Sequence, residues 1–94
     1  MGTLSQEEVD QHLARERHWQ RGEGSSIVQQ LDFADFAAAI AFVNRVAEVA
    51  EAANHHPDIL VHGWNKVSLT LSTHSQGGLT DADFALAAQI DLVA

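Results

Sequence analysis

The sequence predicts an α+β fold in which helices cover one face of a four-stranded antiparallel sheet. A long amphipathic segment occupies the middle of the chain, from residue 32 to residue 56. A pair of short strand patterns precedes it and a second pair follows it, and helix-start signals stand near both ends of the chain. Strands joined by short turns pair as antiparallel hairpins. The expected order is therefore α-β-β-α-β-β-α, within a single domain spanning residues 1–94.

Composition narrows the classes of function. The chain has 94 residues, a formal net charge of −8, five scattered Lys and Arg residues and no cysteine. A protein that binds a phosphate backbone needs clustered positive charge, so no nucleic-acid partner is expected. The longest apolar run is too short to span a bilayer, and the N-terminus lacks a secretory pattern. We expect a cytoplasmic protein without thiolate chemistry or a membrane partner.

The first three elements follow from local signals. Ser5 can cap a helix whose third residue, Glu8, reaches back to it, and this helix should run to about Arg15. Residues 18–21 and 27–31 read as two strands joined by the Gly- and Ser-rich turn 22–26.

The long helix should begin at a cap on Asp32, with Asp35 in its first turn. Its apolar residues fall on two flanks, and this leaves two interpretations open: either one flank meets another subunit, or the helix is wedged between the sheet and loops of its own chain. The flank with the more regular spacing, which we expect to face the core, consists of Phe33, Phe36, Ile40, Val43, Ala47 and Ala50; the second consists of Phe42, Val46 and Val49.

The last strands and the last helix follow a proline. Pro57 ends the long helix, and residues 59–64 and 67–74 read as strands joined by a turn at Asn65-Lys66. Thr80 then caps the final helix, with Asp83 as its third residue.

The predicted turn would gather histidines at one corner. If Trp64 pairs with Val67, counting outward places Pro57 opposite His74, within a residue of slip. His74 would then lie beside His55 and His56, and the loop before Asp83 could fold back to the same place. Three imidazoles and a carboxylate would share this corner.

Such a cluster has structural, metal-binding and catalytic interpretations. Asp83 has a sufficient structural role in the helix start, and a structural reading explains the residues about as well as a functional one. Adjacent histidines diverge and form a poor chelating pair, so no metal is expected. No activated nucleophile is evident, and proton transfer near neutral pH, as in dehydration or isomerisation, fits better than acyl transfer.

The spacing of these residues resembles that of the pterin-4a-carbinolamine dehydratases. The resemblance rests on Glu51, His55-His56-Pro57, Trp64, His74 and Asp83, together with Asn65-Lys66-Val67 and Leu71-Ser72-Thr73-His74, and it covers nearly the whole chain. It implies the fold order given above and a homodimer or homotetramer with the long helix at the subunit contact. It implies loss of water from a 4a-hydroxytetrahydropterin to give the quinonoid dihydropterin, without a cofactor, beside an aromatic amino acid hydroxylase.

The resemblance also implies roles for individual residues. His55, His56 and His74 would form the acid–base set, with Asp83 or, less directly, Glu51 orienting an imidazole. Asn54 stands where the family often has aspartate. Some relatives are non-catalytic dimerisation cofactors or assembly chaperones, which is the rival function, but the complete histidine set favours the enzyme. The residues expected to contact the pterin are Glu51, Asn54, His55, His56, Ser72, Thr73, His74 and Ser75.

Overall fold

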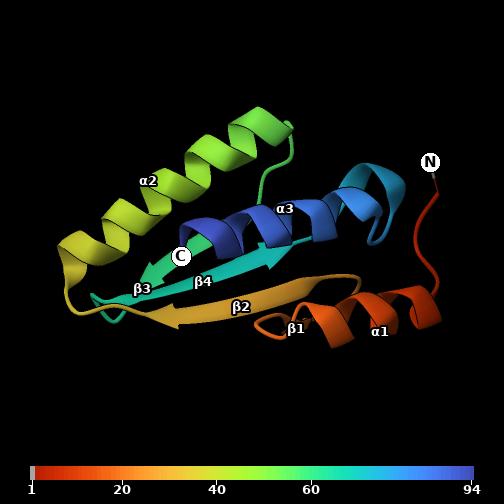
Figure 1. Ribbon diagram of the computed structural model, residues 1–94, viewed down its shortest axis with the longest axis horizontal. Helices are drawn as coiled ribbons and strands as arrows, with labels where there is room; N and C mark the ends of the chain where they lie inside the picture. Colours follow the sequence, from red (N-terminus) through yellow and green to blue (C-terminus); the bar gives the residue numbers. More distant parts are fainter. Residues whose placement is uncertain (1) are drawn as a thin grey trace.

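The chain folds into three α-helices and four strands in the predicted order (Figure 1). The computed structural model describes residues 2–94. No helix within that range combines the length and the apolar character needed to cross a membrane. The elements are α1 (Gln6–Arg15), β1 (Gln20–Arg21), β2 (Ile27–Asp32), α2 (Phe36–Ala53), β3 (Asp58–His62), β4 (Lys66–Leu71), the short 3₁₀ turn η1 (His74–Gln76) and α3 (Asp81–Val93).

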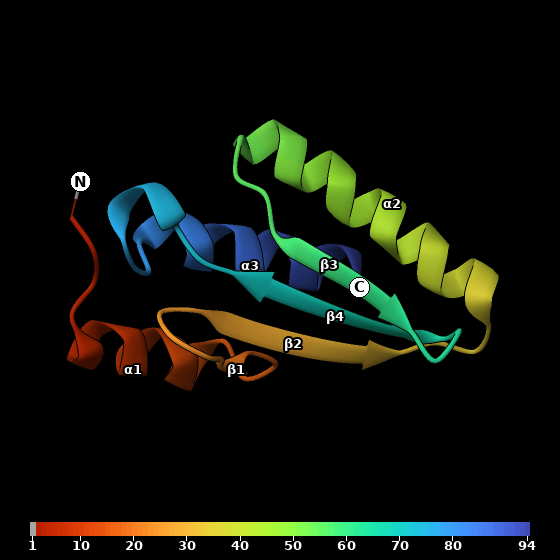
Figure 2. The ribbon, with the colours of Figure 1, turned by 180° about the vertical axis from the view of Figure 1, so that it is seen from behind.

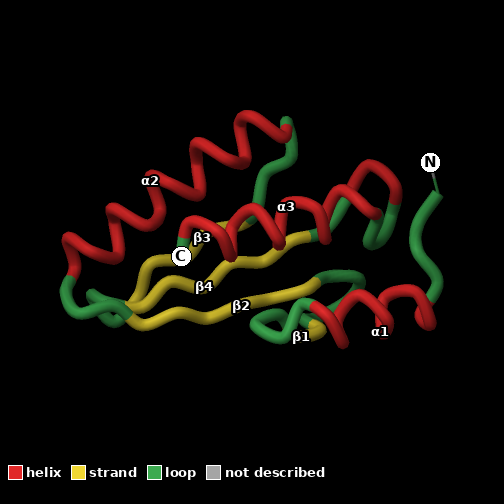
Figure 3. The backbone as a smooth tube through the Cα atoms, viewed as in Figure 1, coloured by secondary structure: helices red, strands yellow, loops and turns green. Residues whose placement is uncertain are grey.

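The four strands form one antiparallel sheet in the order β1-β2-β4-β3 (Figure 3). Side chains alternate between a buried and a more open face: Val67, Leu69 and Leu71 of β4 are buried, whereas Ser68 and Thr70 are partly exposed. Helix α3 crosses the sheet in front of the strands in Figure 1 and lies behind them in Figure 2. The prediction of an antiparallel sheet with helices on one face is confirmed.

Both terminal helices begin where their caps predicted. Ser5 and Glu8 form a reciprocal pair at the start of α1, with Glu8 Oε1 accepting from the Ser5 N–H at 2.8 Å. At the start of α3, Asp83 accepts from the Thr80 N–H at 3.0 Å. These local hydrogen bonds satisfy amides that the first turn of a helix leaves without partners.

The start of α2 differs from the prediction. The cap is Asp35, whose carboxylate accepts from the Ala38 N–H at 2.8 Å, whereas Asp32 ends β2. Phe33 explains the delay, because its N–H donates to the Asn65 carbonyl and its carbonyl accepts from Asn65 Nδ2, both at 2.8 Å. These two bonds hold the chain against the hairpin tip, so the helix begins only after them.

The face of α2 that packs into the core also differs from the prediction. Of its four buried residues, Phe42 and Val46 come from the flank expected to be secondary and Ala50 from the flank expected to face the core, whereas Ala39 belongs to neither. Phe36, on the flank expected to face the core, is 54% exposed. Within this chain α2 carries an apolar stripe that is open in part and is called the open apolar stripe here: Phe36 and Ala47 are exposed, and Ile40 and Val43 are half-buried.

The β3–β4 hairpin has a longer turn than predicted. His62 pairs with Lys66 and Val61 with Val67, so the turn is Gly63-Trp64-Asn65 rather than Asn65-Lys66. Gly63 and Trp64 both have positive φ (56° and 60°), and glycine adopts that conformation without steric cost. The ladder ends with Asp58 opposite Thr70, so the predicted pairing of Pro57 with His74 is wrong.

Candidate active site

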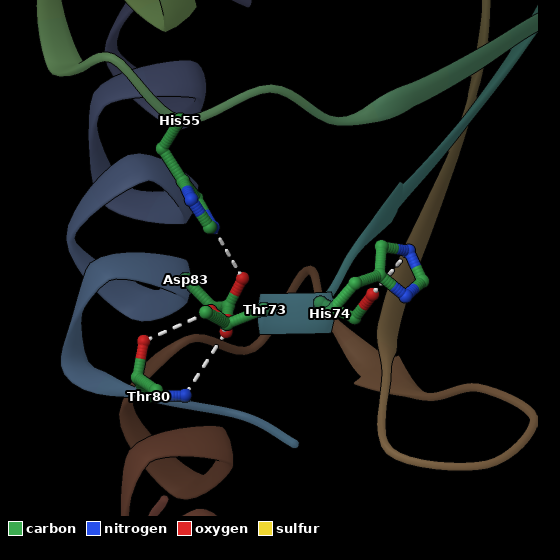
Figure 4. Close-up of polar contacts among 6 residues, drawn as sticks. His55, Thr73, His74, Thr80 and Asp83 are labelled. Carbon is green, nitrogen blue, oxygen red and sulfur yellow. Dashed lines mark hydrogen bonds and ion pairs between the residues drawn. The ribbon is translucent and has the colours of Figure 1, made fainter. Parts of the chain in front are cut away.

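The most buried polar group of the site is the carboxylate of Asp83, in the first turn of α3. Its side chain has no exposed surface, and it accepts three hydrogen bonds (Figure 4). The donors are His55 Nε2 at 2.6 Å, Thr73 Oγ1 at 2.7 Å and the Thr80 N–H at 3.0 Å. An ionised carboxylate only accepts, so His55 Nε2 is the donor of this bond.

The end of α2 sends the two adjacent histidines in different directions. Asn54 adopts a left-handed conformation (φ 52°, ψ 41°), and its N–H donates to the carbonyls of Ala50 and Glu51. Asparagine tolerates this geometry at a helix end. After this turn His55 reaches Asp83, while His56 returns toward the helix, with Nε2 at 2.5 Å from Glu51 Oε2. The His56–Glu51 pair is largely exposed, unlike the His55–Asp83 pair.

His74 lies in η1, just beyond the end of β4, and lines a cavity of about 680 Å³. Its Nε2 is 3.1 Å from the hydroxyl of Ser72, which lines the same cavity together with Thr73. The β1–β2 loop, residues 22–26, contributes Glu23 to Ser26 to the wall. The cavity thus places an imidazole and two hydroxyls beside a space open to a ligand.

Thr73 joins two neighbouring centres that the sequence predicted as one. Its hydroxyl donates to Asp83, and its residue also lines the His74 cavity. Figure 4 shows the His74 ring pointing away from the His55–Asp83 pair. Among the described residues, the cavity wall includes Ser72, Thr73 and His74 of the predicted set, and does not include Glu51, Asn54, His55, His56, Ser75 or Asp83.

The predicted set omits part of the cavity wall. Asp58 and Thr70, which pair across β3 and β4, both line the cavity, as does the β1–β2 loop. Ser68, Thr70 and Ser72 alternate with buried residues along β4 and the residue after it. With the observed register, this pattern would have predicted Thr70, and Asp58 opposite it, as residues of the cavity wall. The β1–β2 loop has only the composition of a turn, which does not predict a place in the cavity wall.

The polar side chains of this site do not form a set of metal ligands. Across residues 2–94, no group of three or more His, Asp or Glu side chains is arranged to hold a metal ion. The polar groups of the site are instead paired, each imidazole with a carboxylate or a hydroxyl. Paired imidazoles of this kind suit the binding and transfer of protons.

Comparison with known proteins assigns the chain to a family. The family model described as pterin 4 alpha carbinolamine dehydratase matches residues 2–93. The chain belongs to the pterin-4a-carbinolamine dehydratase family.

Two groups of relatives illustrate the range of that family. A Chloroflexus aggregans protein, provisionally named a pterin-4-alpha-carbinolamine dehydratase, is 50% identical over 97% of this chain and 96% of its own. A Metallosphaera sedula protein with the same provisional name is 44% identical over 97% and 93% of the two chains. Among solved structures, a Brucella melitensis protein described as a transcriptional coactivator/pterin dehydratase has a TM-score of 0.92 at 31% identity, covering 99% of both chains. A pterin dehydratase-like protein identified as a RuBisCO assembly factor in the alpha-carboxysome has a TM-score of 0.67 at 27% identity, covering 81% of this chain and 88% of its own.

Proposed function

We propose that this protein is a dehydratase that removes water from a 4a-hydroxytetrahydropterin, in the recycling of the pterin used by an aromatic amino acid hydroxylase. The observation that carries the proposal is His74 on the wall of a cavity of about 680 Å³, where Thr73 of the same wall bonds to Asp83, the partner of His55. The cavity is large enough for a bicyclic pterin, and it belongs to a chain of the dehydratase family.

The reaction needs one proton delivered and one removed. A carbinolamine loses its hydroxyl as water when an acid protonates that oxygen, while the lone pair of N5 forms the C=N bond to C4a. A base then takes the proton that the ring gives up, which yields the quinonoid dihydropterin. In the proposed mechanism His74 faces the substrate, and Ser72 holds one of its nitrogens. Well-placed proton transfer contributes about 10²–10⁴ in rate.

The other two histidines complete the proposed acid–base set. Asp83 fixes the ring of His55, and Glu51 fixes that of His56, through one nitrogen in each case. The second nitrogen of each ring is then available to exchange a proton. Thr73 would transmit the position of Asp83 to the cavity wall, because it contacts both. In this proposal Asn54 and Ser75, which are exposed and lie outside the described cavity wall, also contact the pterin.

Turnover of the 4a-hydroxytetrahydropterin tests the proposal. Wild type should accelerate dehydration well above the spontaneous rate, and His74→Gln should lose about 10²-fold of kcat. His62→Gln is the matched control, because His62 bonds to Ser68 on β4 and lies outside the cavity wall. Wild-type rates equal to the spontaneous reaction would overturn the proposal, and so would equal losses in the two variants.

A binding role is the second candidate, since a structural neighbour at 27% identity is described as a RuBisCO assembly factor. In either case we propose that the open apolar stripe on α2 is a subunit contact within a homodimer or homotetramer, since an apolar helix face that is partly exposed is typical of interfaces. A relative that works only by binding would form a stable complex through such a face without its histidines. Retention of a partner complex by a chain lacking His55, His56 and His74, together with no turnover by wild type, would favour that role.

A further inference from the structure

A second cavity adjoins the one that contains His74. It has a volume of about 150 Å³ and lies between the N-terminal segment and the β1–β2 loop. Four residues line both cavities: Gly24, Ser25, Gly77 and Gly78. The two spaces therefore meet along a boundary built largely of glycine.

This boundary carries few side chains. A Cβ atom at Gly24 or at Gly77 would meet no atom within 4 Å, so the space beside both is open. Gly78 passes closely between its neighbours, and a Cβ there would lie 3.0 Å from Cγ2 of Thr3. A larger residue at Gly78 would crowd Thr3, whereas glycine places no side chain at the boundary between the two cavities.

Reaction chemistry sets the direction in which a bound substrate would extend. In a 4a-hydroxytetrahydropterin the reacting atoms C4a and N5 are adjacent, and C6 is bonded to N5. A histidine that exchanges protons at the reacting atoms must therefore lie near the substituent on C6. Gly77 and Gly78, only a few residues beyond His74, line the boundary with the second cavity. The second cavity is thus free volume that begins within a few residues of His74.

Arg21 is the charged residue among those that line the second cavity. Its side chain is 41% exposed and belongs to a chain with only five Lys and Arg residues. Both of its hydrogen bonds, to Asp10 Oδ1 at 2.6 Å and to the Gln6 carbonyl at 3.2 Å, leave from Nη2. The Nε and Nη1 donors of the guanidinium are left for a ligand, and a planar fork of donors suits phosphate or carboxylate.

We infer that the second cavity is a subsite for the C6 substituent of the pterin, and that Arg21 selects substrates whose substituent ends in an anion. This inference rests on the proposed dehydratase function. About 150 Å³ accommodates a short chain with one charged group, since a water in the liquid occupies about 30 Å³. Asp10 holds the guanidinium in place and also reduces its charge, so it should oppose the selection that Arg21 provides.

The experiment compares three 4a-hydroxytetrahydropterins that differ at C6: a methyl group, a neutral dihydroxypropyl group, and the same chain ending in a phosphate monoester. Wild type should show a KM about tenfold lower for the phosphorylated substrate than for the neutral one, as expected for a charge-assisted contact. Arg21→Gln should abolish this ratio. Asp10→Asn is the matched control, because it removes the same ion pair but keeps the cation, and it should preserve or increase the ratio.

The outcomes separate this inference from the proposed function. Acceleration of the methyl substrate by wild type tests the dehydratase activity alone. If that activity is present and wild type has equal KM values for the neutral and phosphorylated substrates, the subsite inference is wrong. It is also wrong if Arg21→Gln and Asp10→Asn change the ratio alike, because the ion pair would then matter only for stability, which thermal unfolding of both variants would show.

Discussion

His55 Nε2 lies 2.6 Å from Oδ1 of Asp83, a carboxylate with no exposed surface. The contact joins the segment after α2 to the first turn of α3. Burial of a charge without hydrogen-bond partners is costly, and here three donors from three different segments supply them. The pair therefore links the fold to the site, because Thr73 and the Thr80 N–H hold Asp83 in place and Asp83 in turn fixes the ring of His55.

Asp83→Asn should weaken both the fold and the activity. The amide offers one acceptor in place of two carboxylate oxygens and turns an N–H donor toward groups that themselves donate. We expect a loss of about 1–3 kcal/mol in the free energy of unfolding, together with a fall in kcat because His55 loses its orientation. Denaturant unfolding and steady-state turnover measure the two effects.

Asp81→Asn provides the control for this substitution. Asp81 lies in the same turn of α3 and forms only a partly exposed pair with His12 at 3.6 Å. Such surface pairs contribute about 0–1 kcal/mol. If the two variants unfold at the same denaturant concentration, the buried carboxylate does not have the role assigned to it.

The elements of this fold were predictable where the signals are local, and the site was predictable only in part. Ser5 with Glu8 and Thr80 with Asp83 mark helix starts through contacts three residues apart. The start of α2 depended on Asn65, which lies 32 residues from Phe33, and no local pattern carries that contact. The register of β3 and β4 depended on two positive-φ residues at a turn that lacks the usual Asn-Gly signal.

That error in register explains the misplaced histidine. The observed register differs from the predicted one by three residues. Asp58 faces Thr70, and His74 lies beyond the end of the ladder instead of opposite Pro57. His74 instead reaches the site through η1, and its neighbour Thr73 makes the contact to Asp83. The candidate site residues were predicted from their spacing in the sequence, whereas their geometry depends on long-range hydrogen bonds that the spacing does not show.

Glu51→Gln should affect activity more than stability. Glu51 Oε2 accepts from His56 Nε2 at 2.5 Å, and both side chains are more than half exposed. Loss of an exposed pair should change the free energy of unfolding by less than about 1 kcal/mol. If His56 belongs to the acid–base set, kcat should fall severalfold because the ring is no longer held. Glu48→Gln, at an exposed position one turn earlier on α2, should leave kcat unchanged; equal effects of the two substitutions would count against a role for Glu51.

Acid should weaken the start of α1. The backbone hydrogen bond from Ser5, followed by the bond to its side chain, lowers the pKa of Glu8 below its ordinary value of 4.5. A carboxyl group whose pKa is depressed by folding adds stability above its unfolded pKa, and this stability is lost as the pH falls through the folded value. The Tm difference between wild type and Glu8→Gln should therefore be larger at neutral pH than at about pH 3. Glu7→Gln removes the same charge without the bond to Ser5, and it should not reproduce this pH dependence.

Phe36→Glu should dissociate the assembly that we propose forms through α2. Phe36 is 54% exposed and belongs to the open apolar stripe with Ile40, Val43 and Ala47. A carboxylate in an apolar contact loses its hydration without gaining a partner, so association should weaken strongly. Light scattering should show a dimer or tetramer for wild type and a monomer for the variant. Ala37→Glu adds the same charge one residue along, off the stripe, and should keep the wild-type mass. A monomeric wild type at micromolar concentration would instead mean that the stripe is not a subunit contact.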